Sequence, residues 1–343
     1  MASIRDLLSP TVDRGSNEPE SNSRDASPKL DNEPETTHFV VEFILDLVCP
    51  YCYIGFKNLT AAIETYTKNH PEATFDVVCS PYMLDPLATR SAYDKSTYLN
   101  IPKRSIKYWT EQGAQAGISF LWEGRTGSTR DAHKILRFAL EATPTTVRST
   151  AYASQQQTTP SSPDPLSGLR VHPEPPRGPG LQMQWLTALL RAHHETDADI
   201  SSQGFLTSLF TSSPSPSSSS PNPSPSSSSP LSSIPDLSPS TIQTLLTSPS
   251  WDRTLDVLFA NSCSRPGLTV RAVPTFIIND RYVVGGAQSV AFWVEELERV
   301  RVGKGGRRIG DEEMDGRVVG IGEDGMSARF YGDREGERGS PPA

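Results

Sequence analysis

The chain has 343 residues, of which only 35% are hydrophobic, and it contains 30 prolines and 24 glycines. Such a composition indicates less folded structure than the length would allow. A formal net charge of −8 argues against binding to nucleic acid or to an anionic membrane. The sequence has no run of 18 apolar residues that would predict a membrane span, and its four cysteines are too few for a disulfide-stabilised secreted scaffold.

Four stretches are predicted to be disordered because they contain too few apolar residues to form a core. They are an acidic tail at 1–37, two Ser/Pro-rich loops at 142–180 and 211–240, and a Gly-rich, charged tail at 301–343. The first tail has eight acidic and four basic residues and lacks the apolar stretch of a secretory signal. We therefore expect a cytoplasmic protein with no signal peptide and no transmembrane segment.

The remaining residues predict one α/β domain over 38–300. The expected elements, in chain order, are a buried strand at 39–45, a helix from Pro50 to about 69, a strand at 74–79, helical structure over 87–141, helices at 182–191, 242–246 and 251–258, a hairpin of strands 274–279 and 281–284, and a helix at 289–300. This order is typical of a thioredoxin fold, formed by 38–86 and 265–300, with an α-helical domain inserted at 87–264.

The motif Cys49-Pro50-Tyr51-Cys52 is the strongest chemical signal in the chain. If a helix begins at Pro50, Cys49 occupies the N-cap and Cys52 the third helical position. Backbone N–H groups of the first turn and the helix dipole would then lower the pKa of Cys49. We therefore predict that Cys49 is the nucleophile and that Cys52 resolves the mixed disulfide.

Two other interpretations of these cysteines are less favoured. A zinc site would need a second cysteine pair nearby, but the sequence offers only Cys79 and Cys263, so we predict no metal. An inert core pair would not need the intervening proline or the strand before it. We expect Cys79 to be a structural thiol inside a strand and Cys263 one in a loop, with a third redox role for Cys263 as the alternative.

Two further positions are expected to support the motif. Asp46 ends the first strand and either accepts a proton from Cys52 or bonds the backbone where the helix starts. Val273-Pro274 opens a later strand, which in such a fold suggests a cis peptide bond facing Cys49. The backbone beside it would then pair with an extended substrate, the alternative being an ordinary edge-strand proline.

The motifs resemble those of FrnE-like proteins of the DsbA family. CPYCYIG at 49–55 is similar to that family's CPWCYIG, and similar segments occur at 117–133, 191–200, 272–278 and 285–288. Ser128 stands where the family usually has asparagine, and the stretches 142–180 and 211–240 are longer than in the family. The resemblance implies a thioredoxin fold with an inserted helical bundle and thiol-disulfide oxidoreductase activity.

The resemblance also suggests partners and an alternative function. Related 2-hydroxychromene-2-carboxylate isomerases and kappa-class glutathione transferases have serine at the position of Cys49, so the cysteine pair favours redox chemistry over a glutathione-dependent isomerase or transferase. The expected substrate is a protein or small-molecule disulfide or thiol, with no resident cofactor and glutathione as a candidate co-substrate. His133, Tyr51, Val273 and Pro274 are the expected substrate contacts, with packing or capping as the alternative for His133. No oligomeric state is predicted.

Overall fold

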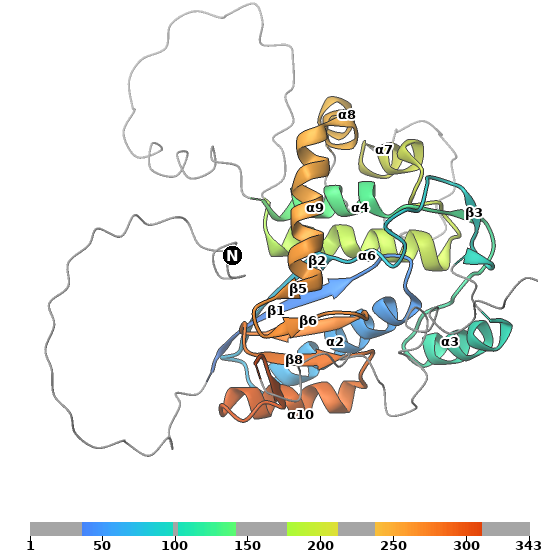
Figure 1. Cartoon of the computed structure of the whole chain (residues 1–343). Coiled ribbons are helices and arrows are strands. Elements are labelled where there is room, and N and C mark those ends of the chain that lie inside the picture. The colour runs from blue at the N-terminus through green and yellow to red at the C-terminus, as the bar shows by residue number, and fades with distance from the viewer. Residues whose placement is uncertain (1–35, 99–101, 142–176, 212–236, 311–343) are drawn as a thin grey trace, which may run out of the picture. The chain divides into compact units, whose positions relative to one another are not determined.

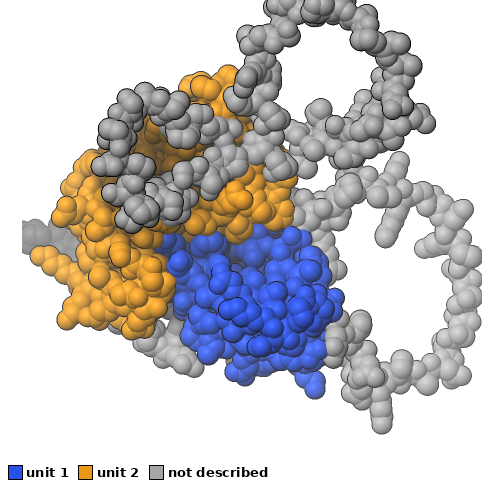
Figure 2. All heavy atoms as spheres, turned by 180° about the vertical axis from the view of Figure 1, so that it is seen from behind, with its two compact units in different colours: residues 1–82, 260–343 blue, residues 83–259 orange. Residues whose placement is uncertain are grey.

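The computed structural model describes residues 36–98, 102–141, 177–211 and 237–310, and the tails and loops predicted to be disordered lie mostly outside these ranges (Figure 1). The chain divides into two compact units, one of residues 1–82 with 260–343 and the other of residues 83–259 (Figure 2). The predicted boundaries, 86/87 and 264/265, fall four to five residues later in each case.

The first unit contains a five-stranded mixed sheet with the strand order β2-β1-β7-β8-β9. Its strands are β1 (His38–Leu45), β2 (Thr74–Pro81), β7 (Thr275–Ile278), β8 (Tyr282–Gly285) and β9 (Arg307–Arg308). β1 is parallel to β2 and antiparallel to β7, and the remaining neighbours are antiparallel. With helices α2 (Pro50–Asn69) and α10 (Val290–Arg301), which pack against each other, these strands form the predicted thioredoxin fold.

Aromatic side chains fill the space between this sheet and its two helices. Phe43 of β1 stacks on Phe276 of β7 with ring centroids 4.6 Å apart, and Phe56 of α2 lies 6.2 Å from Phe43. Trp293 of α10 meets Phe276 edge-to-face at 4.8 Å. Because successive strand residues point to opposite faces, the other face of β1 carries Ile44, which packs with the second core of this unit.

A buried ion pair also lies on that second face of β1. Glu42 is only 4% exposed, and its two carboxylate oxygens accept hydrogen bonds from Arg265 at 2.6 and 2.9 Å. Arg265 belongs to β5 (Ser264–Arg265), which pairs with β6 (Leu268–Thr269). The bidentate geometry explains how a carboxylate is accommodated in a central strand.

The boundary predicted at residue 300 is wrong. α10 continues to Arg301, and the chain then returns to place β9 beside β8, so ordered structure extends through residue 310. Gly306 N–H donates to the buried carboxylate of Glu296, which anchors this return to α10. The sequence did not predict β9, because this strand is only two residues long and both residues are arginine.

The second unit is mainly helical. It contains α3 (Lys103–Gln115), α4 (Arg130–Leu140), α6 (Pro179–Glu195), α7 (Gln203–Thr211), α8 (Pro239–Thr247) and most of α9 (Pro249–Cys263). α4 packs against α6 and α8, and α8 also packs against α7.

Three expectations for this unit need correction. Residues 177–180 and 237–240 are ordered, because α6 starts at Pro179 and α8 at Pro239, and Thr211 still belongs to α7. The region 87–141 is only partly helical, since a short hairpin of β3 (Tyr93–Asp94) and β4 (Arg125–Thr126) separates parts of it. Gly117 and Gly124 in this region have positive φ, a conformation that a helix does not contain. None of the helices in the described ranges is long and apolar enough to cross a membrane.

A buried lysine links three segments of the second unit. Lys95 is 4% exposed, and its ammonium group donates to the carbonyls of Leu121 and His193 at 2.5 Å each and to Asp197 at 2.8 Å. Burial lowers the pKa of Lys95, and burial together with the charge of Lys95 lowers the pKa of His193 to about 3. The His193 imidazole is therefore neutral in the folded protein at neutral pH.

Acid is expected to destabilise the protein partly through His193. In the unfolded chain this imidazole takes up a proton near pH 6.5, whereas in the folded state it does so only near pH 3, so stability falls as the pH is lowered through this interval. The slope should approach about 1.4 kcal/mol per pH unit between roughly pH 5.5 and 4. Urea unfolding at several pH values should show a shallower dependence for His193→Phe. Equal slopes for His193→Phe and the parent would refute this assignment.

Candidate active site

The two cysteines of the motif lie where β1 gives way to α2. Cys49 is the N-cap residue of α2, with extended backbone, and Cys52 occupies the third helical position, as predicted. A tight turn joins strand and helix, in which Cys49 N–H donates to the Asp46 carbonyl at 3.1 Å. Cys52 N–H in turn donates to the Cys49 carbonyl at 3.0 Å. Both cysteines are free thiols.

The expected hydrogen bonds from the helix backbone to the Cys49 sulfur are absent, because the Cys49 side chain makes no capping bond to the first turn of α2. Its thiol instead donates to the Val273 carbonyl, with 3.7 Å between Sγ and the oxygen. A protonated thiol is a hydrogen-bond donor, and the turn between β1 and α2 points the Cys49 thiol at the Val273 carbonyl, which accepts. The Cys49 sulfur therefore lies both at the N-terminus of α2 and next to the Val273 carbonyl oxygen.

The peptide bond between Val273 and Pro274 is cis, which confirms the prediction. The loop is held by the Pro274 carbonyl, which accepts from Gly286 N–H at 2.9 Å, and by Asn58 of α2, which donates to the Gln288 carbonyl at 2.9 Å. The motif and the cis proline, which are distant in the sequence, are thus fixed together within one unit.

Gly55, in the second turn of α2, allows this close approach. A Cβ atom at this position would lie 3.2 Å from Pro274 Cγ and 3.3 Å from the Phe276 ring. Such contacts are tighter than normal packing, so a larger residue would push the cis-proline loop away from the helix. Nothing in the sequence around Gly55 indicates this close approach, because Pro274 and Phe276 lie far away in the chain.

Gly55→Val is expected to destabilise the protein by about 1 to 3 kcal/mol through overpacking and to slow the reaction of Cys49. Urea unfolding and the alkylation rate of Cys49 measure the two effects. Gly204→Val in α7 is the matched control, because a Cβ there would meet only Ser202 Oγ at 3.7 Å. Equal stability losses in the two variants would show that only helix propensity matters.

Both thiols of the motif are buried, and Cys52 is buried more completely than Cys49. Cys49 is 5% exposed and Cys52 is completely buried. Burial is the main cause that raises the pKa of the Cys52 thiol well above its ordinary value, and its hydrogen bond with Cys49 acts in the same direction. Cys52 is therefore protonated at neutral pH and must lose its proton before it can act as a nucleophile.

Asp46 is positioned to influence that proton. Its side chain is 1% exposed, and its charge raises the pKa of Cys52 while its backbone lowers it. The Asp46 carbonyl also accepts from Cys49 N–H, so the residue fixes the helix start as well. Both roles considered for Asp46 are compatible with this position.

Tyr82 is a neighbour of this acid that the sequence analysis missed. Its N–H donates to the Leu45 carbonyl at 2.8 Å, and burial, with the charges of Cys263 and Asp46, raises its pKa to about 12. Its place directly after β2, next to the end of the parallel strand β1, is the sequence signal that could have identified it.

The other candidate residues are distributed as follows. Tyr51 is partly exposed on the first turn of α2, whereas His133 is 3% exposed on α4 of the second unit. Cys79 lies inside β2, as predicted, but Cys263 ends α9 and does not lie in a loop. Within the described ranges, no group of three His, Cys, Asp or Glu side chains could hold a metal ion.

Comparisons with known proteins agree with this architecture. Residues 40–167 match the family model of the DSBA-like thioredoxin domain. A solved structure of a probable DsbA oxidoreductase from Streptomyces coelicolor is similar, with a TM-score of 0.50 and 18% identity over 79% of this chain and 92% of that chain. 2-Hydroxychromene-2-carboxylate isomerase gives a TM-score of 0.43 and 11% identity over 76% and 95% of the two chains. No curated protein matches.

The topology and the similar structure define a thioredoxin fold of the DsbA type. The match to the DSBA-like thioredoxin domain spans residues 40–167, which is less than half of the chain.

Proposed function

We propose that the protein is a thiol-disulfide oxidoreductase in which Cys49 forms the mixed disulfide and Cys52 resolves it. The observation that carries this proposal is the position of the Cys49 thiol, at the start of α2 and 3.7 Å from the carbonyl next to the cis proline, with Cys52 buried one turn deeper. A thiol that lies beside the backbone next to a cis proline suits the recognition of an extended disulfide substrate, which pairs with that backbone.

The reaction balances in two exchanges. The Cys49 thiolate attacks one sulfur of the substrate disulfide, so that a Cys49–substrate S–S bond forms and the other sulfur leaves as a thiolate and takes up a proton. Cys52 then loses its proton and attacks the Cys49 sulfur, which releases the second substrate thiol. The substrate is reduced to two thiols, and the protein is oxidised to a Cys49–Cys52 disulfide; the reverse sequence oxidises a dithiol.

Asp46 is the proposed acceptor of the Cys52 proton. Because Cys52 is fully buried, water does not solvate a thiolate there, and a nearby carboxylate offers the proton a destination. The hydrogen bond between the two cysteine side chains keeps Cys52 within reach of the sulfur that it must attack.

The proposed substrate is a protein or small-molecule disulfide or thiol, with glutathione as a candidate co-substrate in the cytoplasm and no resident cofactor. Val273 and Pro274 would contact the substrate backbone, and Tyr51 would contact its side chains from the first turn of α2. His133 is proposed to contact substrate from α4.

The direct test is to trap the mixed disulfide. Full-length Cys52→Ser protein, incubated with glutathione disulfide, is expected to gain one glutathione at Cys49, located by mass spectrometry of peptides. The parent should release the adduct by forming its internal disulfide, and Cys49→Ser should gain none at Cys52, which is buried. Absence of an adduct at Cys49, or an adduct mainly at Cys79 or Cys263, would contradict the proposal. Turnover of a small molecule with glutathione that persists in Cys52→Ser would instead favour an isomerase or transferase.

A further inference from the structure

Helix α2 donates hydrogen bonds to the chain around Pro274 from two well-separated residues. At the N-cap, the Cys49 thiol donates to the Val273 carbonyl, with 3.7 Å between sulfur and oxygen. Further along the helix, the half-buried Asn58 side chain donates from Nδ2 to the Gln288 carbonyl at 2.9 Å. Because both donors belong to one continuous helix, α2 holds this part of the first unit at two points.

The turn that follows β8 connects the Asn58 hydrogen bond to Pro274. Gly286 N–H donates to the Pro274 carbonyl at 2.9 Å, from a φ of 76° that favours glycine. The Gln288 side chain donates back to the Gly285 carbonyl at 2.7 Å, which closes the turn. Since Asn58 holds the Gln288 carbonyl, a turn that moved away from α2 would carry away the donor to Pro274 as well.

Residues 272–274, here called the bend, lie outside the strand ladder because β7 begins at Thr275. The Thr275 hydroxyl donates to the Ala272 carbonyl at 2.8 Å and closes the bend on itself. Packing of Pro274 against Gly55 limits how closely the bend can approach α2, but a steric contact does not stop the bend from moving away. Hydrogen bonds from α2 provide that restraint.

The two hydrogen bonds from α2 differ in their dependence on oxidation. The Cys49 bond needs the S–H proton, which is lost when the sulfur enters a disulfide with Cys52 or with a substrate. The sulfur and the Val273 oxygen would then face each other without a hydrogen atom between them. The amide of Asn58 has no redox chemistry, so its bond to Gln288 is available in every state of the cysteines.

We propose that Asn58 is a positioning residue that keeps the bend in place while Cys49 is part of a disulfide. The inference rests on the proposed redox function, in which Cys49 passes through such disulfides. Without the Asn58 donor, the dithiol form would still have the hydrogen bond from Cys49, whereas the disulfide form would have neither of the two bonds. Loss of Asn58 therefore destabilises the disulfide form more than the dithiol form.

A glutathione titration of the full-length protein tests this difference. Two glutathione molecules reduce the Cys49–Cys52 disulfide to two thiols and become glutathione disulfide, and their two protons pass to the protein sulfurs. Asn58→Leu removes the donor at similar size, and Asn58→Asp keeps the shape but presents a carboxylate that cannot donate. Both should shift the equilibrium constant about three- to tenfold toward the dithiol, as measured by alkylation and mass spectrometry of the peptide that contains both cysteines.

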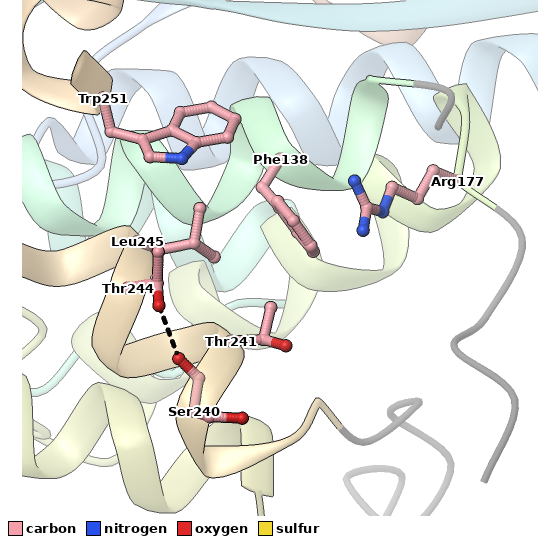
Figure 3. Close-up of a pocket in the computed structure, with 7 residues that line it drawn as sticks. All are labelled: Phe138, Arg177, Ser240, Thr241, Thr244, Leu245 and Trp251. Carbon is pink, nitrogen blue, oxygen red and sulfur yellow. Dashed lines mark hydrogen bonds between the residues drawn. The ribbon is translucent and has the colours of Figure 1, made fainter. Parts of the chain in front are cut away.

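Two threonine variants are the controls for the loss of a hydrogen bond. Thr65→Val removes a bond within α2, from the exposed Thr65 hydroxyl to the Ala61 carbonyl at 2.8 Å. Thr244→Val removes a similar bond in the second unit, where Thr244 lines a pocket and donates to the Ser240 carbonyl at 2.9 Å (Figure 3). Because neither bond reaches the bend, both variants should stay within about 1.5-fold of the parent constant.

Hydrogen exchange tests the same restraint without any disulfide. Cys49→Ala lacks the donor at residue 49, as the disulfide form does, and is combined with Asn58→Leu in a double-mutant cycle. Exchange in peptides that cover residues 271–290 should accelerate about twofold or less in each single variant and about tenfold or more in the double variant. The Gly286 N–H, which donates to the Pro274 carbonyl, lies in these peptides.

The proposal is overturned if both Asn58 variants keep the parent equilibrium constant, if only Asn58→Asp shifts it, if Thr65→Val shifts it equally, or if the double variant exchanges no faster than the product of the single effects. A parent protein that forms no Cys49–Cys52 disulfide in any glutathione mixture would contradict the proposed function instead. The hydrogen-exchange cycle would still decide whether Asn58 holds the bend, so the two failures are distinguishable.

Discussion

Replacing Cys49 by serine is expected to reduce the catalysed reduction of a disulfide by about a thousandfold or more. The hydroxyl is far less acidic and less nucleophilic than the thiol, so the first exchange cannot begin. Cys52 cannot substitute for Cys49 because it is completely buried and its pKa is raised by that burial. The measurement is the dithiothreitol-dependent reduction of a fluorescently labelled disulfide peptide by the full-length variant.

Cys263→Ser is the matched control for this experiment. It removes one partly buried thiol of the same unit that lies at the end of α9, outside the motif. The rate should remain within about twofold of the parent, since this thiol takes no part in the proposed exchange between Cys49 and Cys52. A Cys49→Ser variant that keeps more than a tenth of the parent activity would exclude Cys49 as the nucleophile, and a large loss in Cys263→Ser would assign it the third redox role.

Replacing Arg265 by leucine is expected to lower the free energy of unfolding by about 3 to 5 kcal/mol. The change leaves the Glu42 carboxylate buried in the central strand without the two hydrogen bonds that Arg265 donates at 2.6 and 2.9 Å. Stability is lost because the buried Glu42 charge is left without a partner, and not because the Glu42–Arg265 ion pair itself is strongly stabilising. Urea unfolding at pH 7 gives the measurement.

The double variant Glu42→Leu/Arg265→Leu separates these two origins. It should recover much of the lost stability, because neither charge then remains buried. Lys107→Leu serves as the control for an exposed ion pair, since the Lys107 and Glu111 side chains are 81% and 60% exposed, and it should cost less than about 1 kcal/mol. If Arg265→Leu were as mild as this control, the buried pair would have no structural importance.

The local features of the candidate site could be predicted from the sequence, because they depend on neighbouring residues. A buried strand, a turn and a proline that starts a helix place Cys49 at the N-cap and Cys52 at the third helical position. The cis bond before Pro274 was predicted only by combining a proline at a strand start with the whole fold. The predicted hydrogen-bond partner of the Cys49 side chain was wrong, because the direction of this side chain depends on its tertiary neighbour Val273 and not on the N-cap position alone.

Long-range features could not be predicted in the same way. Glu42 and Arg265 are 223 positions apart, and nothing in the apolar run around Glu42 indicates its partner. The close approach at Gly55 depends on the packing of α2 against β7, which a single glycine in a helix does not reveal. Likewise β9 is too short to show alternation, and its place beside β8 follows from the turn after α10.

The strands of the thioredoxin sheet come from two segments that are far apart in the sequence, and this separation has a consequence for synthesis on the ribosome. Cys49 emerges 224 residues before Val273, the residue whose carbonyl it faces. At about 5 to 20 residues per second, the nascent chain carries its thiols for roughly 10 to 45 seconds before the segment that covers them exists. Until translation reaches that segment, the cysteines are exposed to cellular oxidants and to neighbouring nascent chains without the cis-proline loop that Cys49 contacts in the folded protein.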